Sequence, residues 1–154
     1  MEIDSLEGLL AGHSFLKGLD PEQIALIAGC ARNVRFEQDE YLFREGDPAD
    51  TFFVVREGLV ALELYPPGKD PVVLQTAGAD EIIGWSWMVA PHVWRYSGLA
   101  IEPTRALAID GACLRRKADD NPLLGYLLLT RVAEVMAHRL EATRLQLLDL
   151  YGRD

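Results

Sequence analysis

The residues best suited to ligand chemistry are concentrated in one short segment. Trp85, Trp87 and Trp94 are the only tryptophans among the 154 residues, and Tyr96 lies two residues beyond them. Aromatic rings stack on planar ligands, and Arg95 lies among them, where it could contact a ligand or form a surface salt bridge with Glu102 or Asp80. The same rings could instead fill the interior as core and leave no room for a ligand. The sequence leaves both interpretations open.

Groups that could carry out catalysis are scattered along the chain. His13, His92 and His138 lie far from one another and show no metal-ligand spacing with Cys30 or Cys113. There is no Ser-His-Asp order, nucleophile elbow or P-loop. We therefore expect no enzyme activity, no catalytic residue and no metal site. We also expect both cysteines to be small buried residues with reduced thiols.

The charge balance excludes several classes of partner. The chain has 15 basic and 24 acidic residues, a net charge of -9. Phosphate backbones and anionic membrane surfaces attract clustered basic charge, so we expect no nucleic acid and no membrane as partner. No apolar run reaches the roughly 18 residues of a membrane span. The acidic start, Met1 to Leu10, is unlike a secretion signal, and we expect a cytoplasmic protein.

A β-rich section surrounds the aromatic segment. From Arg32 to Asp110, short apolar and β-branched runs alternate with turn residues. About eight short strands at intervals of about ten residues predict an antiparallel sandwich or barrel. Gly46 and Gly58 lie in turns that favour a positive φ or a close backbone approach.

Helices are predicted on both sides of this section. Asp20, Asp110 and Asn121 are expected N-caps, since Asp20 and Asn121 precede a proline and Gln23 completes a capping box after Asp20. The expected helices are 1–10, one following Asp20, 111–117 and 122–150.

The long C-terminal helix carries two apolar stripes. Leu124, Leu128 and Val135 form one of them. The other consists of Val132, Met136, Leu140, Thr143, Leu147 and Leu150. We expect one stripe to dock on the β section and the second to form a homodimer interface with a partner helix. The alternative is a helix wholly buried by its own domain.

Three segments are distinctive: Phe15–Asp20, Tyr41–Asp50 and Phe52–Val60, with the run FREGDPADTFFVVREG as the most specific part. Together they resemble the cyclic nucleotide-binding domain. This domain is the sensor half of the catabolite activator and fumarate-nitrate-reduction regulators, and it occurs in the regulatory subunits of cAMP-dependent kinase.

The resemblance covers essentially the whole chain and implies one α+β, mainly β, domain over residues 1–154. It implies N-terminal helices (1–31) and an eight-stranded antiparallel β-roll or jelly roll (32–110). It also implies a phosphate-binding cassette (81–100) with a short helix, and C-terminal helices (111–154) that end in a long dimerisation helix.

The cassette departs from the family pattern. In the family, a Gly-Glu pair opens the cassette and the Glu binds the ribose, while an Arg about ten residues later, followed by Ser or Thr, pairs with the phosphate. Gly84 matches the glycine, but Trp85 replaces the Glu. Arg95 has the expected spacing from Trp85, but Ser97 comes one residue late. Counted back from the next strand, Tyr96 takes the position of the Arg.

The resemblance implies a set of candidate ligand-binding residues. They are Gly84, Trp85, Ser86, Trp87, Arg95, Tyr96, Ser97 and Thr143. Arg144 could also reach a ligand base, although dimer packing for Thr143 and a surface charge for Arg144 are alternatives. We expect a non-enzymatic regulatory module whose ligand is a cyclic nucleotide or another nucleotide. The alternative is a ligand-free accessory subunit of an enzyme complex.

Transcription factors of this family carry a helix-turn-helix domain after the long helix. Residues 148–154 resemble the hinge that precedes it, and residues 122–154 carry four Arg against two Glu and two Asp, a formal balance of zero. A neutral apolar helix tolerates self-association. We therefore expect output through protein contacts, with a homodimer and a partner protein or enzyme complex.

Overall fold

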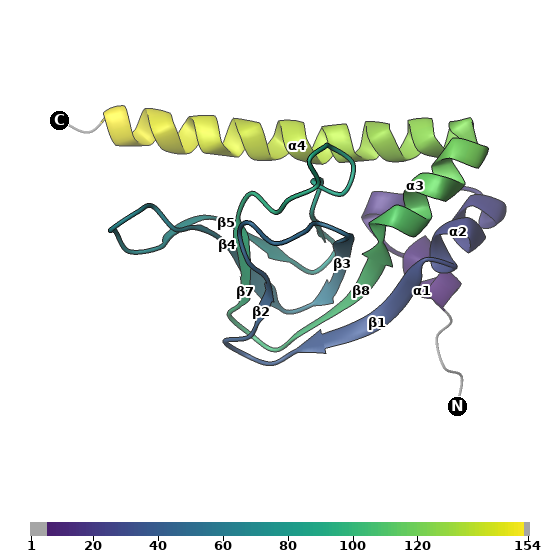
Figure 1. Cartoon of the computed structure of the whole chain (residues 1–154), viewed down its shortest axis with the longest axis horizontal. Helices are drawn as coiled ribbons and strands as arrows, with labels where there is room; N and C mark the ends of the chain where they lie inside the picture. The colour runs from purple at the N-terminus through teal and green to yellow at the C-terminus, as the bar shows by residue number, and fades with distance from the viewer. Residues whose placement is uncertain (1–5, 153–154) are drawn as a thin grey trace.

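Two four-stranded sheets and a set of helices make up the computed structural model, which describes residues 6–152 (Figure 1). In chain order the elements are α1 (Leu6–Ala11), η1 (Ser14–Leu16), α2 (Pro21–Ala28), β1 (Ala31–Phe36), β2 (Tyr41–Phe43), β3 (Thr51–Glu57), β4 (Leu59–Leu64), β5 (Val72–Gly78), β6 (Ile82–Ile83), β7 (Ser97–Ala100), β8 (Thr104–Asp110), α3 (Gly111–Asp120) and α4 (Pro122–Tyr151). The eight strands predicted between Arg32 and Asp110 are confirmed. The first five residues of the helix expected at 1–10 lie outside the described residues.

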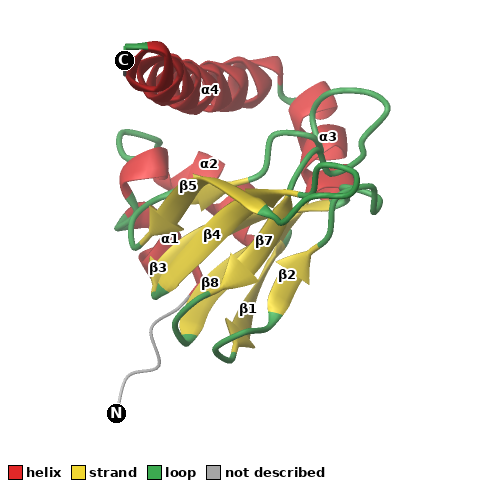
Figure 2. Ribbon diagram, turned by 90° about the vertical axis from the view of Figure 1, so that its left-hand side faces the viewer, coloured by secondary structure: helices red, strands yellow, loops and turns green. Residues whose placement is uncertain are grey.

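The sheets face each other as a β-roll, with α4 lying across one end (Figure 2). One sheet has the order β1-β8-β3-β6 and the other β2-β7-β4-β5, and all pairs are antiparallel. Gly46 and Gly58 have φ values of 93° and 109°, as their turns predicted. A Cβ on Gly58 would lie 2.6 Å from the Pro103 carbonyl oxygen, so this turn tolerates no side chain.

Local capping fixes where the helices begin. The Asp20 carboxylate accepts from Gln23 N–H, and the Gln23 side chain accepts from Asp20 N–H, which completes the predicted capping box. The Asp110 side chain accepts from Cys113 N–H, and the Asn121 side chain accepts from Leu124 N–H. Each cap satisfies N–H groups that would otherwise lack a partner in the first turn.

The apolar side chains divide into two clusters, one inside the β-roll and one between the roll and its helices. The roll core includes Phe43, Phe53, Val55, Val60, Leu62, Ile83, Trp94 and Tyr96. The helix-side core includes Phe15, Ile27, Phe52, Trp87, Leu114, Leu124, Leu128 and Val132. Strand β3 contributes to both because alternate side chains of a strand point to opposite faces.

The long helix docks through its first half. Leu124 and Leu128 are buried in the helix-side core, as predicted for the docking stripe. Val132 was expected at a dimer interface, but it is 2% exposed within a single chain, so that assignment is wrong. Met136, Leu140, Leu147 and Leu150, from the same stripe, remain exposed. At Val132 the apolar stripe of α4 packs on the helix-side core. After Val132 the same stripe is exposed.

Two other expectations also need correction. Cys30 and Cys113 form a disulfide with a Cα–Cα distance of 5.8 Å, so they are not the reduced thiols that the sequence suggested. The short cassette helix is replaced by consecutive turns, in which Met88 N–H bonds Trp85 C=O and Val89 N–H bonds Ser86 C=O. Within residues 6–152, no helix combines the length and the apolar character needed to cross a bilayer.

Candidate functional site

The interior of the β-roll is filled by aromatic side chains. Trp94 stacks on Phe43 with ring centroids 3.5 Å apart and planes 8° from parallel. Tyr96 packs edge-on against both rings, at 5.7 and 6.1 Å. Residues from the cassette thus occupy the roll core, but they are Trp94 and Tyr96 rather than Trp85 or Trp87.

The path of the chain into β7 decides which cassette residues face inward. Trp94 N–H bonds Asp47 C=O, and Gly46 N–H bonds Trp94 C=O, which ties this stretch to the loop before β3. Trp94 and Tyr96 are buried while Arg95 between them is exposed, the alternation typical of an extended chain. Tyr96 therefore faces the interior of the roll, and Arg95 lies on the surface.

The remaining cassette residues have other contacts. The Ser97 hydroxyl accepts from Glu45 N–H at 2.9 Å, so it holds the β2–β3 connection. Trp87 stacks on Phe52 at 4.7 Å in the helix-side core and donates its indole N–H to Gly84 C=O. The Ser86 hydroxyl is buried without a partner among the described residues.

A cavity of about 350 Å³ remains at the mouth of the roll, beneath α4. The β section lines it with Leu62, Leu74, Gln75, Trp85 and Tyr96, and α4 lines it with Met136, Ala137, Arg139, Leu140 and Thr143. Of the candidate ligand residues, the structure brings Trp85, Tyr96 and Thr143 together here. We call this space the roll-mouth cavity. Its volume lies within the range of small-molecule sites.

Arg139 is a cavity residue that sequence reasoning missed. One terminal nitrogen, Nη2, donates to Ile82 C=O, whereas Nη1 is buried without a partner among the described residues. Arg139 lies four residues before Thr143, the helix residue that the resemblance implied as a ligand contact, and this helical spacing was the available signal. Arg144 is exposed and pairs with Glu141 at 3.3 Å, and the structure does not place it among the lining residues of this cavity.

Thr143 and Gln75 connect α4 to β5 at the cavity edge. The Gln75 side-chain N–H donates to Arg139 C=O at 2.9 Å and to the Thr143 hydroxyl at 3.2 Å. Further along the helix, the Gln146 side chain donates to Leu74 C=O at 2.8 Å. These bonds hold the exposed half of α4 over the roll.

The phenol of Tyr96 lies in a polar corner of this cavity. Tyr96 is 8% exposed and its hydroxyl lacks a hydrogen-bond partner among residues 6–152. Burial raises the pKa of the phenol, and the nearby Arg139 guanidinium and Gly84 backbone only partly oppose this. Tyr96 therefore presents a neutral hydroxyl, next to a cation, to anything bound in the cavity.

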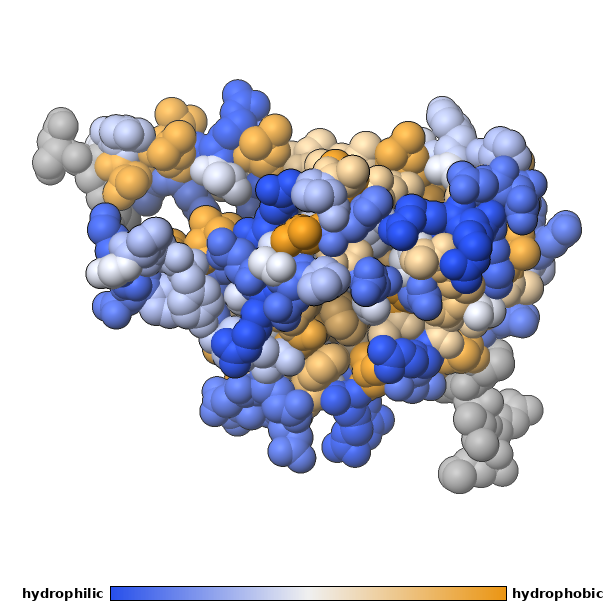
Figure 3. Space-filling model, in the orientation of Figure 1, coloured by the Kyte–Doolittle hydropathy of each residue, from blue (hydrophilic) through white to orange (hydrophobic). Residues whose placement is uncertain are grey.

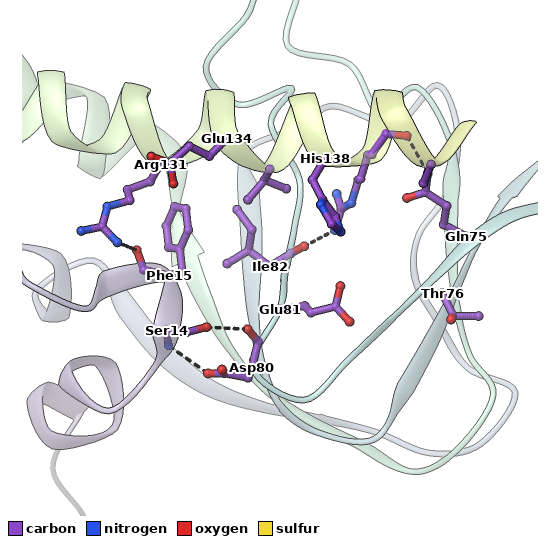
Figure 4. Close-up of a pocket in the computed structure, with 13 residues that line it drawn as sticks. Ser14, Phe15, Gln75, Thr76, Asp80, Glu81, Ile82, Arg131, Glu134 and His138 are labelled. Atoms are coloured by element: carbon purple, nitrogen blue, oxygen red, sulfur yellow. Dashed lines mark hydrogen bonds between the residues drawn. The ribbon is translucent and has the colours of Figure 1, made fainter. Parts of the chain in front are cut away.

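A larger cleft of about 720 Å³ lies between α4, η1 and the β5–β6 connection, and Gln75 and Arg139 line this one too (Figure 4). Several of its charged groups already have structural partners. The Asp80 carboxylate accepts from Ser14 N–H, and Arg131 donates to Phe15 C=O and Lys17 C=O. These contacts hold the N-terminal turn against the roll and the helix. Within the described part of the chain, no group of three or more metal-ligating side chains occurs.

Comparison with known proteins agrees with this architecture. The cyclic nucleotide-binding domain model matches residues 33–121. The CRP-like cAMP-activated global transcriptional regulator of Mycobacterium tuberculosis is 27% identical over 149 residues, 97% of this chain. The chain spans 65% of that regulator's length.

Solved structures give the same assignment. A Geobacter metallireducens protein assigned to cyclic nucleotide binding is 30% identical, with a TM-score of 0.74, and the match covers 90% of this chain and 99% of that one. The N-terminal domain of a Streptomyces coelicolor transcriptional regulator is 28% identical, with a TM-score of 0.69 and coverage of 87% and 94%. The model match over residues 33–121 and the 30% identical structure show that the chain belongs to the cyclic nucleotide-binding domain family.

Proposed function

We propose that this chain is a non-enzymatic regulatory module that binds a nucleotide-like ligand in the roll-mouth cavity and signals through α4. The observation that carries the proposal is the composition of that cavity. It combines a half-buried ring, Trp85, with the buried polar groups of Tyr96 and Arg139 that lack partners. An aromatic surface for a base and unsatisfied polar groups for an anion are what a nucleotide requires.

The position of the cavity supports output through α4. Met136, Leu140 and Thr143 line the cavity and also belong to the exposed stripe of the helix. A ligand that favours one placement of this half of α4 shifts the equilibrium between placements by its differential affinity. A second copy of the chain that packs on this stripe would contact α4 differently in the two placements.

A thermal-shift panel tests the proposal. The purified chain is heated with cAMP, cGMP, cyclic dinucleotides, and NAD and NADP in both redox forms. A ligand at a hundred times its Kd adds about 2.7 kcal/mol, which raises the Tm of a domain of this size by several degrees. We expect at least one compound to shift wild type and to shift Trp85→Leu less.

The control is Tyr126→Leu, which removes an exposed ring of α4 outside the roll-mouth cavity and should leave the shift intact. A panel without any shift contradicts the proposal.

The packed roll core favours a second candidate function, that of a ligand-free interaction subunit. Trp94 and Tyr96 fill space in the roll interior, and Trp94 stacks on Phe43 at 3.5 Å. Such a module would act as an accessory component of a larger complex through α4. A flat ligand panel, together with a stable complex on a column with a partner protein, would support this candidate instead.

A further inference from the structure

We propose that Arg139 of α4, rather than a cassette residue, recognises the anion of the bound nucleotide. This inference rests on the proposed function and assigns the charged contact within the same cavity. The anion would then be bound by the helix that carries the output.

The placement of the other basic candidate supports this assignment. Arg95 has the spacing that suggested phosphate pairing, but it is exposed, and the inward position belongs to Tyr96. Arg139 is the basic residue among the side chains that line the roll-mouth cavity. A guanidinium from α4 thus takes the place of one from the cassette.

The hydrogen-bond state of Arg139 points to a missing acceptor. Its Nη2 is satisfied by Ile82 C=O, but its Nη1 is buried without a partner in the part of the chain that the structure describes. A buried donor of a charged group without an acceptor is costly, and an oxyanion is the acceptor that a guanidinium binds best. The Tyr96 hydroxyl lies close enough to Arg139 to be affected by its charge, yet it has no partner in hydrogen-bond geometry and could donate to the same anion.

The position of Arg139 on α4 adds a consequence for regulation. Its C=O accepts from Gln75 of β5, so the helix is anchored to the sheet at the residue that would contact the ligand. Charge on the ligand would therefore strengthen the contact between α4 and the roll. An uncharged nucleoside could stack on Trp85 but would not make this contact.

Calorimetric titration of matched variants tests the assignment. The variants are Arg139→Gln and Arg95→Gln, and the probes are the nucleotides that shift wild type together with adenosine as the uncharged counterpart. We expect Arg139→Gln to weaken nucleotide binding about 10- to 100-fold, as loss of a charged hydrogen bond does. Arg95→Gln should bind like wild type, and adenosine should bind both variants equally.

Arg139→Lys, which keeps the charge, guards against loss of the fold and should recover part of the affinity; circular dichroism checks each variant. Normal nucleotide binding by a folded Arg139→Gln would overturn the inference but leave the proposed function intact. If only Arg95→Gln loses nucleotide affinity, then the cassette residue Arg95 contacts the anion and the inference is wrong. If wild type binds no nucleotide, the proposed function fails and the inference fails with it.

Discussion

At the scale of single residues, Gly84 shows how closely the cassette approaches the roll core. Its φ is 113°, and a Cβ there would lie 2.8 Å from the Trp94 ring and 3.1 Å from Phe52 Cβ. We expect Gly84→Ala to lower the free energy of unfolding by about 2–5 kcal/mol, because a left-handed conformation and overpacking both add cost. Urea unfolding measures this loss.

Gly46 provides the matched control. Its φ is 93°, but no atom lies within 4 Å of the position that a Cβ would take there. Gly46→Ala should therefore lose only the conformational part, roughly 1–2 kcal/mol. Equal losses in the two variants would contradict the close approach of Trp94 to Gly84.

His13 should make the stability depend on pH. Its Nδ1 accepts from Phe15 N–H and its Nε2 lies 3.2 Å from Val55 C=O, which suits the neutral ring. Burial lowers the pKa of this imidazole from 6.5, and Asp80 only partly opposes the shift. Below pH 6.5 the unfolded chain therefore binds more protons than the folded chain.

We expect the free energy of unfolding to be highest above pH 6.5 and to fall as the pH drops below it. Urea titrations between about pH 5 and about pH 8 span the ordinary pKa of histidine and measure this dependence of the free energy of unfolding on pH. His13→Gln should flatten the slope, while His138→Gln, at an exposed position of α4, should keep it. An unchanged slope in His13→Gln would contradict the assignment to His13.

The sequence predicted the backbone conformation of isolated turns, but it did not predict which cassette side chains point inward. Positive φ at Gly46 and Gly58 follows from local turn chemistry, and both were predicted correctly. Whether Arg95 or Tyr96 faces inward depends on how the chain enters β7, and the spacing from Trp85 does not determine this. Arg139 could not be recognised as a cavity residue because its environment depends on where α4 crosses the roll.

At the scale of elements, the exposed half of α4 predicts self-association. Leu140 and Leu147 are 61% and 52% exposed on one face of the helix, beside the roll-mouth cavity. If this face pairs with a second copy, a charge in it should separate the copies because a buried unpaired carboxylate is costly. We expect Leu147→Glu to be monomeric in sedimentation velocity and wild type to be dimeric.

Leu145→Glu is the control for this substitution. Leu145 is 57% exposed, and helical periodicity places it on the opposite face from Leu147. It should leave the dimer intact. Apolar side chains are visible along this end of the helix among polar ones (Figure 3). A monomeric wild type would contradict pairing through α4.

Elements set by local signals were predicted well, and those set by tertiary packing were not. The caps at Asp20, Asp110 and Asn121 follow from side chains within three residues of the helix start. The expected cassette helix is instead a series of turns, in a segment where Trp87 and Trp94 are buried in two different clusters. Val132 belongs to the same apolar stripe as Met136 and Leu140 in the sequence. Only the docking of α4 determines that Val132 is buried while the later residues of the stripe are exposed.

At the scale of the whole molecule, the Cys30–Cys113 disulfide joins the turn between α2 and β1 to α3, across 83 residues of sequence. Two cysteines alone did not predict it, because pairing depends on the fold that brings their Cα atoms to 5.8 Å. A crosslink that closes a loop of this length restricts the unfolded chain. Its removal should cost about 2–5 kcal/mol.

Urea unfolding with and without a reductant measures this contribution, and mass spectrometry after alkylation counts the free thiols. Wild type should unfold at lower urea in the reductant, whereas the double variant Cys30→Ser, Cys113→Ser should show the lower midpoint in both conditions. Both cysteines lie at the helix-side core, on the α2–α3 side of the domain, and neither lines the roll-mouth cavity. Reduction should therefore lower stability, while any nucleotide affinity at about 25 °C changes little, because the proposed site is formed by the roll and the distal half of α4. A midpoint that does not respond to the reductant, together with two alkylated cysteines in untreated protein, would contradict the disulfide.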